Sequence, residues 1–433
     1  MDRLTFWGRS GVWGALERRR WLWALPAWGR VGLSIALLAC LGWNLTRDIA
    51  YLRTIPIDDI FAYECYARAF WHGPTAVRDA PRTHLCADPR WRFWVGPPRA
   101  YHTLPREYPA PALAVFSLPL LAPFAPYDVA YMTMLAALIC GVTAWLLRRG
   151  LFLCAAACAL YTLVGGWATA LARYDLVPGA LALAALACAQ RSRYGLAYLA
   201  LVAAALLKVY PALLIPVLVI HQRRATGRWP WSHLALCAGA AAVGLLPGAL
   251  LDPASTLQPL AYNGLRPPQI ESLAGSLLWL SGKLGADVQV RFTYHSLNVA
   301  GAGSGLAAWA ATALLVGGLV LTCWRAWRGY DTLARSFVLA LLVTLCGAKL
   351  LSPQYLLWLF PVAAYAEGLR LRWTLLAVLT VAIYPHAYGF HTSLVRLPDQ
   401  PFFMTSILSR NAVLLAMTIA YATADRPRGS LPT

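Results

Sequence analysis

The sequence has little charge for its length and almost no lysine. Asp, Glu, Lys and Arg make up only 13% of the 433 residues, whereas hydrophobic residues make up 59% and the mean hydropathy is +0.55. Soluble globular chains are about a quarter charged. The shortage of charge therefore excludes an ordinary soluble enzyme and indicates that lipid surrounds most of the chain.

Long apolar runs take the place of the missing charge. Most of them approach or reach the roughly 20 residues that an α-helix needs to cross a bilayer. The runs cover 31–46, 128–147, 151–167, 174–189, 231–251, 301–323, 372–390 and 402–423. They lack the alternation of apolar and polar positions that a transmembrane strand shows, which excludes an outer-membrane barrel. We expect an all-α, polytopic transmembrane helical bundle.

The formal net charge of +19 has a simpler cause than binding to nucleic acid. More than half of all Lys and Arg, but fewer than a third of all Asp and Glu, fall in the segments that the apolar runs place on one side: 1–30, 148–150, 190–194, 221–230, 324–335, 367–372 and 424–433. Cytoplasmic loops carry such an excess of basic residues. We expect a multi-pass protein of the plasma membrane, in contact with membrane lipid and without a nucleic-acid partner.

The domain organisation follows from this topology. Residues 1–30 are predicted to be a cytosolic segment, too long and too basic for a cleaved signal peptide. Residues 31–423 form a single transmembrane domain, and residues 424–433 form a cytosolic tail. Three loops face outward: 48–127, 252–300 and 389–401. Both termini are therefore expected in the cytosol, and an active site is expected on the extracytoplasmic face.

The first outer loop is too long for a simple connection and is predicted to be functional. Residues 58–71 read as an amphipathic helix that lies on the membrane surface. Residues 112–124 are apolar but short and flanked by proline, which favours an interfacial or re-entrant segment. Cys65 and Cys86 both lie in this loop, where an oxidising compartment would permit a disulfide.

Whether segment 195–220 crosses the membrane once or folds back as a hairpin determines on which side all later loops lie. It is long enough for one span, but basic residues flank both ends, and Lys208 and Pro211 stand in its middle. Proline breaks a helix, and a lysine at the centre of a membrane is costly. Two short helices that meet at 208–211, with both outer ends cytosolic, account for these features. The bundle then has about 12 crossings, with broken or re-entrant helices.

Three basic residues lie inside apolar stretches: Lys208, Lys349 and Arg410. Each costs roughly 2.5–3.5 kcal/mol to place at the centre of a spanning helix. The functional interpretation is that they line a cavity at the outer leaflet and hold the phosphate of a lipid donor. The alternative is that they snorkel to headgroups or cap broken helices.

Acidic residues near the outer face are the candidates for general-base chemistry. Asp58 and Asp59 begin the amphipathic helix; one of them could cap the helix, which would leave the other free to accept a proton from a sugar hydroxyl. Asp175 follows Arg173 at the outward end of a helix pair. It could cap a helix, pair with Arg173 or bind sugar hydroxyls, and the sequence leaves all three open.

No metal site or cofactor is expected. The histidines near the outer face have no spacing typical of metal ligands; they are His102, His295, His386 and His391. Most of the cysteines lie within apolar runs, where they serve as small packing residues.

Four short motifs, in order along the chain, resemble glycosyltransferase family 87 of the C-type membrane glycosyltransferases. Asp59-Ile60-Phe61-Ala62-Tyr63 is similar to the family's Asp-x-x-x-Tyr, and Tyr108-Pro109-Ala110-Pro111 to its Tyr-Pro-Pro element, with Ala in place of one Pro. The other two motifs are Lys208-Val209-Tyr210-Pro211 and Ser352-Pro353-Gln354-Tyr355-Leu356-Leu357-Trp358.

The resemblance implies inverting transfer of a hexose, usually mannose, from a polyprenyl-phosphate donor to a lipid-linked or cell-envelope glycan. It implies Asp59 as the catalytic base, with Asp58 as the adjacent alternative. Substrate contacts are expected at the other motif positions and at the outward mouth, which are Tyr63, Tyr108, Arg173, Asp175, Tyr210, Gln354 and Tyr355. The alternatives are an arabinofuranosyltransferase, a protein O-mannosyltransferase, or a transporter of lipid-linked saccharides, which broken helices would also suit.

Overall fold

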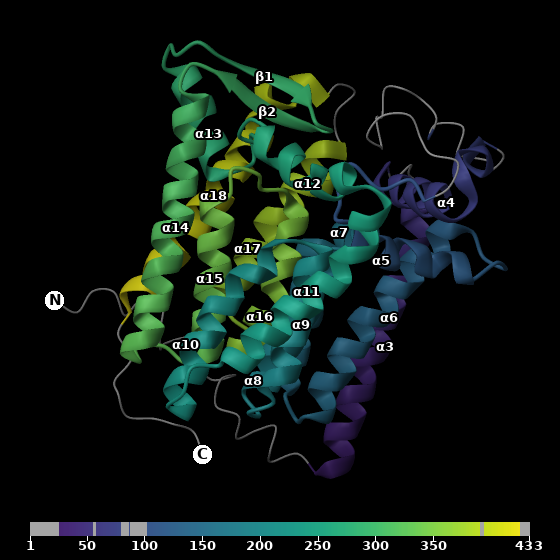
Figure 1. Ribbon diagram of the computed structural model, residues 1–433, viewed down its shortest axis with the longest axis vertical. Coiled ribbons are helices and arrows are strands. Elements are labelled where there is room, and N and C mark those ends of the chain that lie inside the picture. The colour runs from purple at the N-terminus through teal and green to yellow at the C-terminus, as the bar shows by residue number, and fades with distance from the viewer. Residues whose placement is uncertain (1–25, 55–57, 79–85, 87–101, 390–393, 425–433) are drawn as a thin grey trace.

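The computed structural model describes residues 26–54, 58–78, 86, 102–389 and 394–424. Helices dominate this part of the chain (Figure 1). Six of them are long and apolar enough to cross a membrane: α3 (Ala27–Leu52), α6 (Tyr127–Arg148), α7 (Phe152–Ala172), α11 (Trp231–Leu251), α14 (Ser304–Arg328) and α18 (Pro401–Thr423). The protein is therefore a helical membrane protein, as its composition predicts. Most of the cytosolic segments expected at 1–30 and 424–433 lies outside the described residues.

Shorter helices fill the bundle between the long ones. They are α8 (Leu176–Ala189), α9 (Tyr194–Leu207), α10 (Ile215–Thr226), α15 (Leu333–Gly347), α16 (Leu356–Glu367) and α17 (Leu371–Val381). The segments predicted to be outer loops hold α4 (Asp58–Arg78), α5 (Leu113–Ser117), α12 (Pro253–Leu265) and α13 (Leu273–Lys283). Single turns join them: η3 (Ala110–Ala112), η4 (Leu118–Leu121), η5 (Tyr210–Leu214), η6 (Pro353–Tyr355), the π-helical η7 (Ala382–Ala387) and η8 (Leu394–Asp399).

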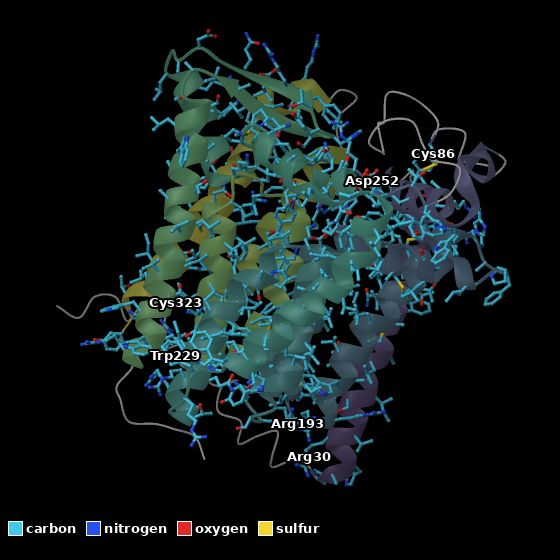
Figure 2. The ribbon with its side chains drawn as sticks, in the orientation of Figure 1. Arg30, Cys86, Arg193, Trp229, Asp252 and Cys323 are labelled. Atoms are coloured by element: carbon cyan, nitrogen blue, oxygen red, sulfur yellow. A yellow bond between two sulfur atoms is a disulfide. The ribbon has the colours of Figure 1, made fainter. Side chains whose placement is uncertain are left out.

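The helix break predicted at 208–211 is confirmed. Helix α9 ends at Leu207, Lys208 has extended backbone angles, and Pro211 lies in η5 before α10 begins. In Figure 2, Arg193 and Trp229, which flank the α9–α10 pair, both lie toward the end of the molecule that carries Arg30. The start of α9 and the end of α10 therefore lie at the same end of the molecule, as the predicted hairpin requires.

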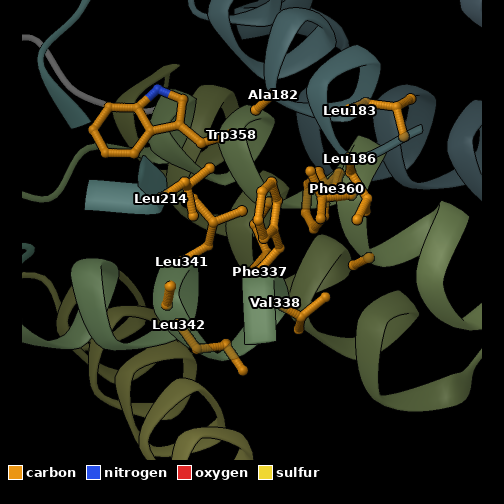
Figure 3. Close-up of a cluster of buried hydrophobic side chains, with 14 of the residues drawn as sticks. Ala182, Leu183, Leu186, Leu214, Phe337, Val338, Leu341, Leu342, Trp358 and Phe360 are labelled. Carbon is orange, nitrogen blue, oxygen red and sulfur yellow. The ribbon is translucent and has the colours of Figure 1, made fainter. Parts of the chain in front are cut away.

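The core of the bundle is built where small residues let helices approach closely. A Cβ atom on Gly179 of α8 would lie 2.4 Å from the carbonyl oxygen of Leu357, and one on Gly165 of α7 would lie 2.6 Å from the Cα atom of Ala377. Around these contacts, buried side chains of α8, α15 and α16 interlock, including Phe337 (Figure 3). This packing holds α7 and α8, and the turn between them, in a fixed position.

A β-hairpin lies in the second outer loop, where the sequence analysis expected no strand. Strand β1 (Val288–Thr293) pairs antiparallel with β2 (Ser296–Gly301). The sequence signal for a strand was the alternation of Val288, Val290 and Phe292 with more polar residues. The strand is only six residues long, so this signal was weak. Apart from this hairpin and isolated bridges such as Gln269 with Asn298, the described secondary structure is helical, so the all-α class holds for the bundle.

Candidate functional site

The first feature of the site is an ion pair between Asp59 and Arg173. Asp59 lies in the first turn of α4, and Arg173 directly follows α7 in extended conformation. A guanidinium nitrogen of Arg173 donates to the Asp59 carboxylate, and both side chains are about one-fifth exposed. The pair joins the candidate base at the start of the amphipathic helix to the arginine that the sequence analysis placed at the outward mouth of a helix pair. Helix α4 begins at Asp58, the alternative base, whose side chain lies outside the described part.

Aromatic side chains form a wall beside this ion pair. Tyr63, one turn after Asp59, stacks on Phe116 of α5 with ring centroids 4.4 Å apart. The ring centroids of Tyr108 and Tyr174 lie 5.6 and 5.7 Å from that of Tyr63, and both pairs have edge-to-face geometry. Tyr63 is fully buried, whereas Tyr108 is only partly buried. Residues of two motifs, Tyr63 and Tyr108, thus meet Tyr174 at one place.

The second feature is a buried ion pair between Lys208 and Asp175. Lys208 Nζ lies 2.5 Å from Asp175 Oδ1, which also accepts a hydrogen bond of 2.7 Å from Trp358 Nε1. Asp175 is completely buried, and its other oxygen, Oδ2, has no hydrogen-bond partner among the described residues. Asp175 makes no capping bond and no ion pair with Arg173. Of the three roles open to it, capping and pairing with Arg173 are not seen, and binding to a sugar hydroxyl stays a prediction.

Aromatic rings surround the Lys208 ammonium group. Its Nζ atom lies 4.8 Å from the ring centroid of Tyr355, 5.3 Å from that of Tyr174 and 5.4 Å from that of Trp358. Tyr210 stacks on Trp358 with centroids 3.9 Å apart. Ring faces stabilise a cation that has lost water. The motifs at 208–211 and 352–358 therefore build one cage around Lys208.

Gln354, another predicted substrate contact, accepts a hydrogen bond of 2.9 Å from the Ser352 hydroxyl. This bond lies in the break between α15 and α16, next to the cage. Lys349 lies in the same break, and its Nζ atom donates to the carbonyl oxygen of Gly264 at 2.5 Å. Lys349 is thus tied to the end of α12 rather than to the partners of Lys208.

Arg410, the third basic residue, is completely buried in the middle of α18. It lies 3.5 Å from a carboxylate oxygen of Glu271, and it donates to the backbone oxygen of Glu271 at 2.5 Å. Arg410 therefore has a full set of protein partners. The three cations predicted to hold one phosphate have three different partners in the structure.

Comparison with protein families decides the class of the molecule. The family model of glycosyltransferase family 87 matches residues 107–353, which is more than half of the chain. The chain belongs to glycosyltransferase family 87. It is therefore a glycosyltransferase, an enzyme that moves a sugar from a donor to an acceptor. A search of curated proteins and a search of solved structures gave no match.

The matched range of this family 87 enzyme includes most of the residues described above. Tyr108, Arg173, Asp175, Lys208 and Lys349 lie inside it. Asp59, Arg410 and the greater part of the 352–358 motif lie outside it. The aromatic cage is thus shared between the matched range and the helix that follows it.

Sequence reasoning missed two acidic residues of the glycosyltransferase. Glu271 neutralises Arg410 and accepts a hydrogen bond of 2.7 Å from the Tyr388 hydroxyl. Glu107 accepts a hydrogen bond of 3.1 Å from the Tyr262 hydroxyl, and burial raises the pKa of Glu107 above its ordinary value. Glu107 directly precedes the motif at 108–111, and Glu271 directly precedes an apolar stretch. Acidic residues are rare in such places, and this rarity could have marked both as candidates.

The disulfide that the sequence permits in the first outer loop of the glycosyltransferase is present. The sulfur atoms of Cys65 and Cys86 are bonded, with Cα atoms 5.7 Å apart. Among the described residues, no group of three or more His, Cys, Asp or Glu side chains could hold a metal ion. His391 lies outside the described residues.

Proposed function

We propose that this glycosyltransferase transfers mannose from a polyprenyl-phosphate donor to a lipid-linked or cell-envelope glycan on the outer face of the plasma membrane, with inversion and without a metal. The observation that carries the proposal is the meeting of Asp59 with Arg173 beside Tyr63 and Tyr108. A carboxylate and a guanidinium in contact supply the two charges that such a transfer needs: a base for the acceptor and a cation for the phosphate.

The reaction is a single displacement at the anomeric carbon. The acceptor oxygen forms the new bond as the bond to the donor phosphate breaks, and Asp59 takes the proton of the acceptor hydroxyl. The polyprenyl phosphate leaves with an additional negative charge, which nearby cations stabilise. Asp58, the neighbouring carboxylate, is the alternative base.

Arg173 has a specific part in this proposal. While it pairs with Asp59, the carboxylate is a weak base because the guanidinium stabilises its charged form. A phosphate is a strong competing partner for a guanidinium, since its oxygens match the two parallel N–H groups of arginine. Donor binding would draw Arg173 toward the phosphate and leave Asp59 ready to accept a proton.

The basic residues in the membrane are proposed to supply positive potential around the donor. Lys349 is the most accessible of them, because its ammonium group bonds only a carbonyl oxygen among the described residues. Lys208 and Arg410 contribute to this potential without direct contact with the donor, because each is paired with a buried carboxylate. Asp175 Oδ2 is proposed to accept a hydrogen bond from a sugar hydroxyl. Tyr210 and Tyr355 stack on the ring of Trp358, which donates to the other oxygen of Asp175.

The proposal is tested with membranes that contain the enzyme, radiolabelled polyprenyl-phosphate mannose and a mixture of cell-envelope lipids. Label should move to an acceptor, and Asp59→Asn should lower the rate by about 100-fold or more, because asparagine cannot take up the proton. Asp399→Asn, a change of an exposed carboxylate on η8, is the control. Donor that crosses the membrane without transfer would favour a transporter, and full activity in both Asp59→Asn and Asp58→Asn would refute the assigned base.

A further inference from the structure

Two arginines share one tyrosine on the outer side of the enzyme. The guanidinium carbon of Arg106 lies 5.5 Å from the ring centroid of Tyr262, and that of Arg266 lies 5.7 Å from the same centroid. Tyr262 belongs to α12, Arg266 follows this helix directly, and Arg106 comes from the first outer loop. The ring therefore brings together positive charges from two outer loops.

This cluster has more positive than negative charge. Arg106, Arg266 and Lys349 form no ion pair with any carboxylate of the described residues, and Arg266 acts electrostatically on Lys349 as a like charge. The acid beside them is Glu107, which attracts Arg266 electrostatically and which Tyr262 and His295 also contact. Like charges held together are unfavourable unless something neutralises them. The cluster thus calls for an anion.

One atom of the cluster also lacks a partner inside the protein. The Nε atom of Arg266 is buried and has no hydrogen-bond partner among the described residues, whereas one terminal nitrogen donates to the Ser296 hydroxyl at 2.7 Å. A buried N–H group without an acceptor costs free energy. An anion that accepts from Nε would satisfy this donor and neutralise the charge in the same step.

The base of the cluster is rigid. The backbone of Gln269 donates to the Lys349 carbonyl at 2.9 Å, and the Ile270 backbone donates to the Leu297 carbonyl of the hairpin at 3.0 Å. Within the hairpin, the Asn298 amide donates to the Thr293 carbonyl at 2.6 Å and fixes the turn. The hairpin and the segment before α13 thus hold Lys349 in position, and Ser296 on the same hairpin orients Arg266.

The turn of the hairpin faces the same cluster. Tyr294 and His295 both have positive φ angles, of 52° and 54°, which are uncommon for residues other than glycine. The Tyr294 ring lies 5.2 Å from the Tyr262 ring, and His295 Nε2 lies 3.7 Å from Glu107. Backbone strain of this kind concentrates at functional sites. The strained turn therefore borders the cluster.

We propose that Arg106, Arg266 and Lys349 form an outward-facing site for the phosphate group of a lipid substrate. The site rests on the proposed function for its ligand, because that phosphate belongs either to the polyprenyl donor or to a phosphate-bearing lipid acceptor. Arg266 binds it through Nε and the adjacent nitrogen, Arg106 through its fork, and Lys349 as a point charge. The Tyr262 ring lies beside both guanidinium groups.

Binding of farnesyl phosphate to the purified full-length enzyme tests the site, with farnesol as the uncharged reference. We expect Arg266→Gln and Arg106→Gln each to weaken binding of farnesyl phosphate about tenfold, the effect of losing a charged hydrogen bond. Farnesol binding should stay unchanged, which also shows that each variant is folded. Arg291→Gln, on exposed strand β1 of the same hairpin, is the matched control.

A second variant guards against a structural effect. Arg266→Lys keeps the charge but loses the planar fork, and it should weaken binding of farnesyl phosphate less than Arg266→Gln. Unchanged binding in both glutamine variants, or a parallel loss of farnesol binding in the folded protein, would overturn the site.

Transfer kinetics separate the two sources of the phosphate. A rise in KM for the polyprenyl-phosphate sugar assigns the site to the donor, and a rise in KM for the acceptor assigns it to the acceptor. Transfer with both KM values unchanged overturns the site but leaves the proposed function intact. If arginine-dependent binding of farnesyl phosphate occurs without any transfer from polyprenyl-phosphate sugars, the proposed function fails and the phosphate site stands.

Discussion

Asp59 and Arg173 form an ion pair although 114 residues separate them in the sequence. The pair links the first outer loop to the turn between α7 and α8. Because each side chain neutralises the other in the free enzyme, the role of one cannot be judged without the other. Their coupling is therefore the most direct measure of the proposed mechanism.

Removal of Arg173 should show this coupling. Arg173→Gln is expected to lower kcat/KM by about 100-fold, because the donor phosphate loses a bidentate partner. Combined with Asp59→Asn, it should add far less than this factor, since two residues that act as a unit have non-additive effects. A double-mutant cycle on the transfer rate makes the measurement. Losses that multiply fully would show that the two side chains act independently.

The Lys208–Asp175 pair should contribute strongly to stability, because Asp175 is completely buried. Lys208→Met leaves a buried carboxylate without its cation, which is expected to lower the free energy of unfolding by about 3–5 kcal/mol. Unfolding of the purified enzyme in mixed detergent micelles measures this change.

The double variant Lys208→Met with Asp175→Asn should recover part of that loss, since no charge is then left buried. The control is Arg68→Gln, which breaks the partly exposed pair of Arg68 with Glu64 and should cost no more than about 1 kcal/mol. Equal effects of Lys208→Met and Arg68→Gln would contradict the importance of the buried pair.

The sequence predicted those parts of the fold that depend on local chemistry. Proline and a lysine inside an apolar run marked the break at 208–211, and apolar length identified the spanning helices. The charge pattern placed Arg193 and Trp229 at the same end, where Figure 2 shows them. These properties reside in neighbouring residues, so a single sequence carries them.

Partners across the fold could not be predicted in the same way. Asp175 had three open roles, and its contact with Lys208 depends on how α8 packs against α9 and α16. Glu271 and Arg410 meet over 139 residues, a pairing that only the packing of α13 on α18 creates. The β1–β2 hairpin was not predicted, because the alternation of apolar and polar residues covers only a few positions inside a polar loop.

Sidedness can be checked by cysteine labelling of intact cells with a membrane-impermeant maleimide. Leu284→Cys, in the second outer loop, lies at a position where the leucine is 89% exposed, and it should react in intact cells. Ala225→Cys, near the end of α10, should react only after the membrane is opened. The parent chain is the control for its native free cysteines, of which Cys40 is exposed. Labelling of both positions in intact cells would refute the hairpin.

Glu107 should make the stability of the enzyme depend on pH. Burial raises the pKa of Glu107 above its ordinary value of 4.5, and the opposing effects of His295 and Tyr262 are smaller. The folded enzyme therefore keeps this proton at pH values where the unfolded chain has lost it. By linkage, the free energy of unfolding falls as the pH rises from about 4.5 through the pKa of the folded state, and then levels off.

Glu107→Gln removes this dependence because glutamine does not ionise. The apparent melting temperature of the variant, relative to that of the natural enzyme, should rise as the pH increases from about 4 to about 7. Asp399→Asn, which alters an exposed carboxyl, should show no comparable trend. A difference between Glu107→Gln and the natural enzyme that stays constant with pH would mean that Glu107 ionises as it does in the unfolded chain, and that its burial beside Tyr262 has no electrostatic cost.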